Sequence, residues 1–153
     1  MDPKNSSPVL LLKELESRRA LPIWIGMFEA NAIATSLAGL EPPRPMTHDL
    51  LYNSILSAGC TVDRVVVTEL KDNTFFAVIV LDSGSGSLEI DSRPSDAIAL
   101  AVRAKAPIFA SEEVLEQSGI DLGAVEEGVS GERDEWLEML ENMDPEDYSK
   151  YKM

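Results

Sequence analysis

The alternation of apolar and polar positions near the start of the chain predicts two strands and a helix. Apolar residues dominate 9–14 and 19–25, and a short polar stretch separates them, as in two strands joined by a turn. The segment 29–37 is rich in Ala with little Gly or Pro, and Gly39 follows it, which favours a short helix that ends there. The expected unit is a β-hairpin followed by a helix.

The same order of elements returns in the second half of the chain. Apolar runs at 75–81 and 88–91 flank a turn of Ser and Gly at 82–87. Pro94 then begins a helical pattern that continues to Lys105, because Pro is well tolerated in the first turn of a helix. A second hairpin and helix are therefore expected.

A proline-marked connection and a further helix follow each unit. Thr47 is the expected N-cap of the helix after the first unit, and the helix after the second unit follows Ser111. Between the units, the β-branched run 62–70 is expected to pair with 75–81 through the turn residues 71–74.

Two stretches, 23–37 and 88–102, look like copies of one unit set 65 positions apart. Four positions are identical at that offset, where chance gives roughly one in a window this short. They pair Ile25 with Ile90, Ala32 with Ala97, Ile33 with Ile98 and Ala34 with Ala99. We therefore expect an α+β fold of internally duplicated β-hairpin–helix–helix units, with a mixed or antiparallel sheet packed on apolar helices.

The candidate core contains both of the Ala-rich helices. Residues 30–37 and 97–104 are apolar nearly all round, so both helices are expected to be buried. Trp24 and Phe28 are interpreted as core residues in preference to base-stacking platforms, and Cys60 as a small buried residue.

Length and composition fit one compact domain followed by a tail. With 153 residues, 44% of them hydrophobic, the chain can form one well-packed core but is short for two. We place a domain at 1–120 and an acidic tail at 121–153, within which 132–143 regains helical spacing. This acidic C-terminal helix is expected to fold back or to pair with a neighbouring subunit, in preference to docking on another protein.

The net charge of −14 at first argues against a nucleic-acid ligand, whose phosphates attract Lys and Arg. Most of the charge lies late in the chain: 111–153 hold 14 acidic and 3 basic residues, whereas 1–110 hold 13 acidic and 10 basic residues. The body is therefore near neutral and is able to present a local cationic site. The candidate cations are Arg18, Arg19, Arg44, Arg93, Arg103 and Lys105.

The sequence predicts a cytoplasmic protein with no membrane partner. No apolar run approaches the roughly 20 residues that span a bilayer, and residues 1–8 lack the apolar region of a secretory signal. The lone Cys60 excludes an intrachain disulfide and a cysteine-based metal cluster.

Residues 91–96 (DSRPSD) place polar side chains where a strand passes into a helix. Free backbone N–H groups, the hydroxyls of Ser92 and Ser95 and the guanidinium of Arg93 are able to bind a phosphate there. The alternative is that Ser92 or Ser95 caps the helix. In that alternative Arg93 pairs with Asp91, and the residues alone favour it slightly.

His48, the single histidine of the chain, is the second candidate for chemistry. It is able to act as a general base with Asp49 nearby, although a histidine in the first turn of a helix is more often a surface residue. A Mg²⁺ site built on Glu29, Asp91 and Asp96 is conceivable, but no spacing amounts to a metal signature.

Five segments resemble those of the bifunctional nuclease domain family, and the resemblance runs from about residue 2 to about residue 119. The segments are 21–26 (LPIWIG), Arg44-Pro45 with 47–51 (THDLL), 72–77 (DNTFFA), 91–101 (DSRPSDAIALA) and 106–109 (APIF). The resemblance implies an α+β domain with an internal duplication and a tendency to self-associate. It also implies the DNase and RNase activity attributed to plant members.

The leading hypothesis is a homo-oligomeric nuclease that binds nucleic acid and hydrolyses the phosphodiester bonds of RNA, DNA or both. Arg44, Arg93 and Ser95 are the candidate substrate-binding residues. His48 and Asp96 are the candidate catalytic residues, which would handle protons with or without Mg²⁺. The alternative is a non-catalytic regulatory or scaffold module with a small-anion or protein-binding site, and the sequence leaves this choice open.

Overall fold

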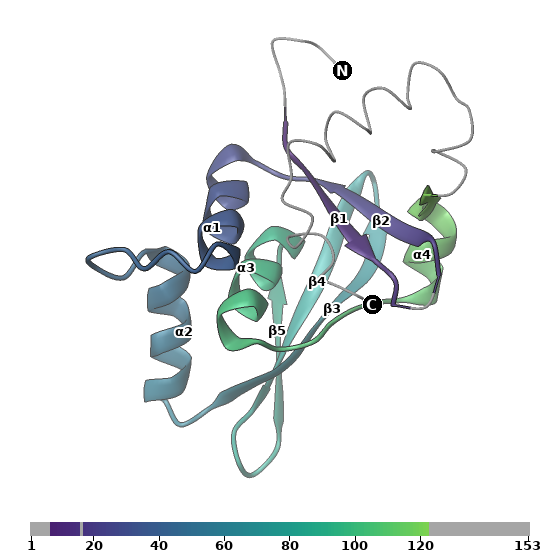
Figure 1. Ribbon diagram of the computed structural model, residues 1–153. Coiled ribbons are helices and arrows are strands. Elements are labelled where there is room, and N and C mark those ends of the chain that lie inside the picture. The colour runs from purple at the N-terminus through teal and green to yellow at the C-terminus, as the bar shows by residue number, and fades with distance from the viewer. Residues whose placement is uncertain (1–6, 16, 123–153) are drawn as a thin grey trace.

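The computed structural model describes residues 7–15 and 17–122, which fold into helices and strands in mixed order (Figure 1). In chain order the elements are β1 (Val9–Lys13), β2 (Arg19–Trp24), α1 (Met27–Leu37), α2 (Thr47–Ser57), β3 (Thr61–Lys71), β4 (Thr74–Asp82), β5 (Ser87–Ser92), α3 (Pro94–Ala104), β6 (Ile108–Ala110), α4 (Glu112–Ser118) and β7 (Ile120–Asp121). The helix predicted at 132–143 lies outside the described residues, and the predicted domain boundary near 120 lies at their margin.

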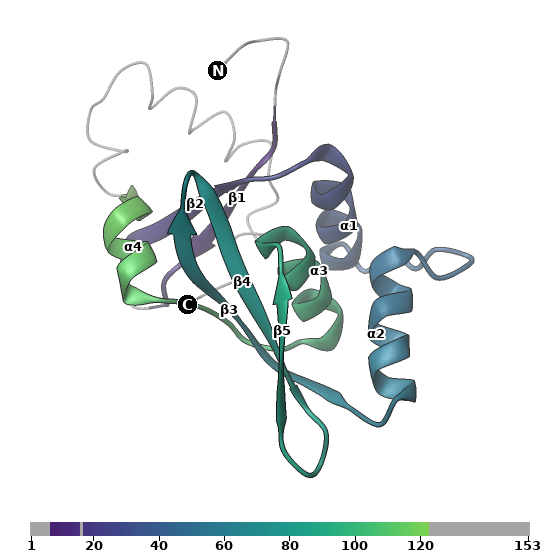
Figure 2. The ribbon, with the colours of Figure 1, turned by 180° about the vertical axis from the view of Figure 1, so that it is seen from behind.

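The strands form two sheets, which confirms the predicted α+β class. The larger sheet has the order β5-β4-β3-β6 and is mixed, because β6 pairs with β3 in parallel and the other pairs are antiparallel. The smaller sheet has the order β1-β2-β7 and is antiparallel. Figure 2 shows β5 at the outer edge of the larger sheet.

The turn between β3 and β4 follows directly from its sequence. Asp72 and Asn73 both have positive φ, at 52° and 59°. Two consecutive left-handed residues match the right-handed twist of a hairpin, and Asp and Asn tolerate that conformation better than most residues. The predicted pairing of 62–70 with 75–81 is confirmed, with bulges between Val62 and Arg64 and between Val67 and Glu69.

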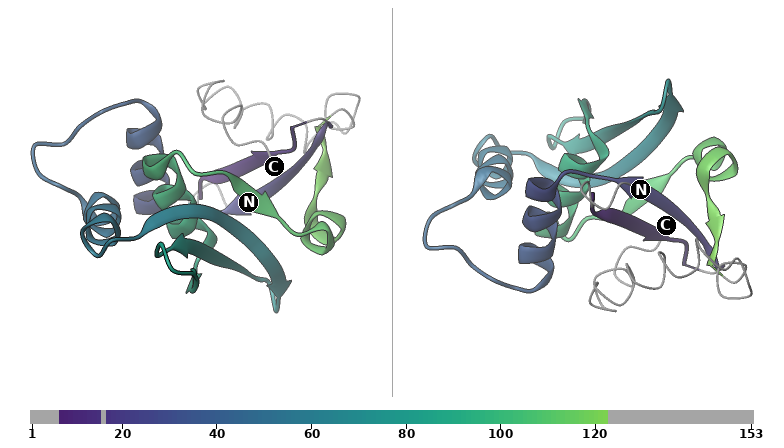
Figure 3. Two further views of the ribbon diagram at one scale, coloured as in Figure 1. Left: turned by 90° about the horizontal axis from the view of Figure 1, so that it is seen from below. Right: turned by 90° about the horizontal axis from the view of Figure 1, so that it is seen from above.

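Helix α3 is the centre of the core, as its sequence predicts. Ile98, Ala99, Leu100 and Ala101 are each 0% exposed. The helix packs against α1, α2, β3 and β4, and Figure 3 shows it lying between α1 and these strands. Its small Ala residues allow neighbouring elements to approach closely, so α3 joins the helices to the larger sheet.

The prediction that α1 is buried is wrong, and so is the placement of Trp24 and Phe28 in the core. Ile33 is the buried residue of α1, because this helix contacts α3 with one side and leaves the other to solvent. Phe28 precedes Ile33 by five residues, which turns its side chain about 140° away around the helix. Phe28 is 90% exposed, and Trp24, at the end of β2, is 52% exposed. Cys60 is half-buried against the core.

The order hairpin then helix occurs twice, in β1-β2-α1 and in β4-β5-α3. The two hairpins belong to different sheets. The connection from α3 to α4 contains the strand β6, whereas the connection from α1 to α2 contains no strand in the described residues. The internal duplication therefore stays a prediction from the sequence.

No helix in residues 7–15 and 17–122 has the length and apolar character needed to cross a membrane.

Gly119, which follows α4, is expected to resist substitution. A Cβ atom there would overlap the backbone carbonyl oxygen of Leu115, which the helix cannot readily move. Gly119→Ala is expected to lower the free energy of unfolding by about 1–2 kcal/mol, measured by urea denaturation. Gly86→Ala is the matched control, because a Cβ there meets nothing within 4 Å. Equal stability of the two variants would contradict the steric account.

Candidate active site

His48 lies in the first turn of α2, and that turn is held by its own capping interaction. Met46, in place of the predicted Thr47, is the N-cap residue. The backbone N–H of Met46 donates to Asp49 Oδ2 at 2.9 Å, which fixes the start of the helix. The His48 side chain is only 14% exposed, so its ring is held in one place.

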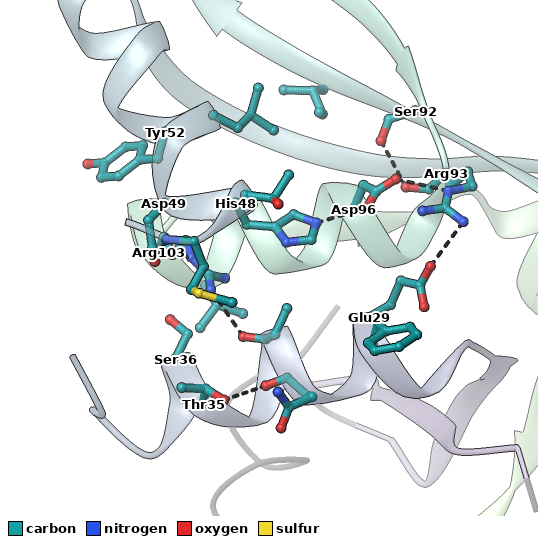
Figure 4. A pocket seen from close by; sticks show the side chains of 18 of the residues that line it. Glu29, Thr35, Ser36, His48, Asp49, Tyr52, Ser92, Arg93, Asp96 and Arg103 are labelled. Atoms are coloured by element: carbon teal, nitrogen blue, oxygen red, sulfur yellow. Dashed lines mark hydrogen bonds and ion pairs between the residues drawn. The ribbon is translucent and has the colours of Figure 1, made fainter. Parts of the chain in front are cut away.

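The His48 ring contacts a carboxylate from a different helix. His48 Nε2 lies 2.8 Å from Asp96 Oδ1, and Asp96 is in the first turn of α3. The two residues are 48 positions apart in the chain, and the packing of α2 against α3 brings them together. Figure 4 shows their side chains pointing toward each other from these two helices.

Arg93 extends this contact to α1. Its Nε donates to Asp96 Oδ2 at 2.9 Å, and its Nη1 lies 3.1 Å from Glu29 Oε1 (Figure 4). The Arg93 side chain remains 64% exposed, which leaves part of it able to meet a ligand. Glu29, Arg93, Asp96 and His48 thus form one connected row across α1, the start of α3 and α2; we refer to these four residues as the site row.

The capping alternative for residues 91–96 is wrong in its details. Arg93 is the N-cap residue of α3, and its side chain makes no capping hydrogen bond. The hydroxyl of Ser92 donates to the carbonyl oxygen of Arg93 at 2.8 Å. Arg93 pairs with Asp96 and Glu29, because these carboxylates lie across the helix start from it.

The hydrogen bonds of Asp96 set the proton positions in the site. Burial of this carboxyl raises its pKa, but the hydrogen bonds from His48 and Arg93 outweigh burial and hold the pKa below its usual value. The hydrogen bond and charge of Asp96 in turn raise the pKa of Arg93. An ionised carboxylate only accepts hydrogen bonds, so His48 Nε2 carries the donated proton. The tautomer that makes this hydrogen bond has its lone pair on Nδ1.

The lowered pKa of Asp96 makes a prediction for acid unfolding. A carboxyl whose pKa is lower in the folded state stabilises the fold above its ordinary pKa, and this contribution disappears as the pH falls through the folded value. Asp96→Asn removes the titration. We therefore expect the difference in unfolding free energy between wild type and Asp96→Asn to shrink as the pH falls below the ordinary pKa of an aspartate and through the lowered folded-state value. Urea denaturation at each pH measures it, and parallel curves would contradict the assignment.

Arg103 holds the three helices around the site in place. Its side chain is 9% exposed, and its Nε donates to Asp49 Oδ1 at 2.6 Å. Two carbonyl oxygens complete its hydrogen bonds, those of Ala99 at 2.8 Å and Ala32 at 3.2 Å. The hydrogen bond from the Met46 N–H lowers the pKa of Asp49. Burial of the carboxyl acts in the opposite direction, and the hydrogen bond from Arg103 lowers the pKa as well. Arg103 therefore fixes the turn that carries His48.

A wide pocket opens over the site row. Its volume is about 1470 Å³, above the roughly 300–1,000 Å³ of a small-molecule site, and it is bounded by α1, α2, α3 and the β4–β5 hairpin. Acidic residues outnumber basic ones along its walls. The acidic residues are Glu29, Glu41, Asp49, Asp91 and Asp96, and the basic ones are Arg93, Arg103 and Lys105.

The structure brings three of the five predicted site residues to this pocket. His48, Arg93 and Asp96 line it. Ser95 is 7% exposed and is absent from the pocket wall, because it faces the core at the start of α3. Arg44 is exposed on the connection between α1 and α2 and is also absent from the wall.

Glu29 and Asp96 do not present the arrangement expected for Mg²⁺. Both carboxylates bind Arg93, so the guanidinium occupies the place between them. Within residues 7–15 and 17–122, no three His, Cys, Asp or Glu side chains converge as metal ligands would. A Mg²⁺ ion that used Glu29 and Asp96 together would require Arg93 to move away.

A histidine, two carboxylates and an arginine thus meet at a wide pocket of this α+β domain. A model of the bifunctional nuclease domain matches residues 10–123, and the chain belongs to this family. An uncharacterized protein of Mycobacterium tuberculosis is 39% identical over 152 residues, which cover 95% of this chain and 90% of that protein.

Plant relatives are more distant and much longer. Bifunctional nuclease 1 of Arabidopsis thaliana is 27% identical over 117 residues, which cover 74% of this chain and 36% of the plant protein. Bifunctional nuclease 1 of Oryza sativa subsp. japonica is 24% identical over 123 residues, which cover 76% of this chain and 37% of the plant protein. The similarity to the plant proteins is therefore confined to about one third of their length.

Proposed function

We propose that this protein is a nuclease that hydrolyses phosphodiester bonds in RNA, DNA or both. The observation that carries the proposal is the row of contacts from Arg93 to Asp96 to His48, with distances of 2.9 and 2.8 Å, on the wall of a wide pocket. Membership of the bifunctional nuclease domain family supports the same activity.

The chemistry follows from the proton positions in the site row. His48 Nδ1 holds the lone pair and acts as the general base, which takes a proton from the water that attacks phosphorus. A new P–O bond forms to the oxygen of that water, the P–O bond to the leaving oxygen breaks, and the leaving oxygen takes a proton from the imidazolium or from solvent. Asp96 keeps the ring oriented and stabilises the imidazolium that results. The exposed N–H groups of Arg93 stabilise the charge that develops on the non-bridging oxygens.

Purified wild-type protein should cleave end-labelled single-stranded RNA or DNA, and the activity should co-elute with the protein through two different chromatographic steps. Parallel reactions in EDTA and in Mg²⁺ measure whether a divalent ion participates. Activity that separates from the protein would contradict the proposal, because it would belong to a contaminant.

The acidic pocket favours a second candidate function, a non-catalytic module that binds a small anion or a protein. Arg93 already binds two carboxylates, and acidic residues exceed basic ones along the pocket wall. Under this alternative, a short oligonucleotide neither binds nor is cleaved at low salt, where phosphate contacts are strongest. Binding without cleavage would favour a regulatory role.

We further propose that the protein is cytoplasmic and self-associates. Among the described residues β5 forms one edge of the larger sheet, and its Leu88 and Ile90 are 49% and 43% exposed. A free strand edge with exposed apolar side chains is a common site of pairing between chains. Sedimentation equilibrium measures the subunit number directly.

A further inference from the structure

Phe28 is an aromatic side chain that the fold leaves in solvent at the mouth of the pocket. It lines the pocket and is 90% exposed, the largest exposed fraction of the large apolar side chains in the described part of the chain. Burying a phenyl ring contributes about 2 kcal/mol, and this protein gains almost none of it from Phe28. The ring faces are available to a ligand.

The position of Phe28 relates it directly to the site row. It precedes Glu29 in the first turn of α1, and Glu29 binds the exposed guanidinium of Arg93. When a phosphate of a nucleic acid binds Arg93, the base next to that phosphate therefore lies close to α1. The other Phe and Tyr residues of the pocket wall are less exposed: Tyr52, Phe75 and Phe76 are half-buried, and Tyr52 and Phe75 pack against the core.

The charge of the pocket indicates which part of a nucleic acid supplies affinity. Acidic residues exceed basic ones along the wall, so phosphate contacts are few. Stacking of a base on an aromatic ring contributes about 1–3 kcal/mol and needs no positive charge. A base inside a duplex already stacks on both neighbours, so only an unpaired base can offer its face to Phe28.

We propose that Phe28 is the stacking platform for an unpaired base next to the scissile phosphate, and that the substrate class is single-stranded nucleic acid. This inference rests on the proposed nuclease function and adds a base-binding subsite to it. Phe28 contributes affinity without reading the identity of the base, because every base has an aromatic face.

Fluorescence anisotropy with a labelled 12-residue oligo-U or oligo-dT and with a 12-base-pair duplex tests the subsite. The His48→Ala background prevents cleavage during the measurement. We expect the protein to bind the single strands more tightly than the duplex. Phe28→Ala should lower the affinity for single strands about tenfold, and Phe28→Trp should retain that affinity. Phe109→Ala is the matched control, because Phe109 is an exposed aromatic on β6 outside the pocket.

The salt dependence of binding separates stacking from charge. Phe28→Ala should lower the affinity for single strands by the same factor at all salt concentrations. The slope of the logarithm of the binding constant against the logarithm of the salt concentration should correspond to about one or two phosphate contacts. The subsite is contradicted by equal losses for single strands and duplex, by the same loss in Phe109→Ala, or by no binding of either ligand. It is also contradicted if Phe28→Ala only dissociates an oligomer.

The inference and the proposed function can fail separately. Phe28-dependent binding of single strands without hydrolysis by wild type would uphold the stacking subsite and overturn the nuclease. Hydrolysis with unchanged KM and unchanged strand preference in Phe28→Ala would uphold the nuclease and overturn the subsite.

Discussion

His48→Ala is expected to lower the rate of phosphodiester hydrolysis by about 10²–10⁴-fold, the usual contribution of a positioned general base. In the proposed mechanism Nδ1 of this ring accepts the proton of the attacking water, and alanine leaves no acceptor in its place. The fold should persist, because Asp96 keeps its hydrogen bond from Arg93 when the imidazole is removed. Most of the loss should therefore appear in kcat, with a smaller change in KM.

Asn53→Ala is the matched control for His48→Ala. Asn53 lies on the same helix, is exposed and does not line the pocket, so its removal should leave the rate unchanged. Steady-state kinetics on a labelled oligonucleotide, together with urea denaturation of each variant, distinguish lost chemistry from lost folding. A His48→Ala protein that is folded and cleaves at the wild-type rate would remove His48 from the mechanism.

Arg103→Ala is expected to lower the free energy of unfolding by about 3 kcal/mol or more, since breaking a buried ion pair leaves its partner without compensation. The variant would leave the Asp49 carboxylate and the carbonyl oxygens of Ala99 and Ala32 without their donor. These groups belong to α2, α3 and α1, so the loss should loosen the packing of three helices at once. The turn that carries His48 would move with them.

Arg64→Ala provides the comparison for Arg103→Ala. Arg64 pairs with Asp63 on β3, where the side chains are 44% and 49% exposed, and such surface pairs contribute about 0–1 kcal/mol. Urea denaturation at neutral pH measures both variants. Equal destabilisation of the two, or a change within about 0.5 kcal/mol for Arg103→Ala, would show that Arg103 does not hold the helices together.

The secondary structure was predictable because each element carries a local signal. Pro94 in the first turn, the apolar run after it and the Asp72–Asn73 turn each specify backbone conformation within a few residues. Burial depended on more than composition. Helices α1 and α3 have similar Ala-rich sequences, yet α3 lies between α1 and the larger sheet whereas α1 packs on one side only. Position in the assembled fold, which no local pattern encodes, decides between them.

The site shows the same division between local and long-range information. His48, Arg93 and Asp96 were identifiable by residue type and by their places at helix starts, and the structure brings them together. The roles of Glu29 and Arg103 were not predictable. Arg103 meets Asp49 across 54 positions, and Glu29 meets Arg93 only because α1 packs beside α3. Ser95 matched a phosphate-binding pattern, but the orientation of the first turn of α3 directs it into the core.

The measurement that tests the account most directly is a double-mutant cycle between His48 and Asp96 in oligonucleotide hydrolysis. Because Asp96 acts on the reaction only through the His48 ring that it orients, the losses of the two variants should not add. We expect the double variant, with His48→Ala and Asp96→Asn, to cleave no more slowly than His48→Ala alone. Losses that multiply in the double variant, or the absence of hydrolysis by the wild-type protein, would contradict the central claim.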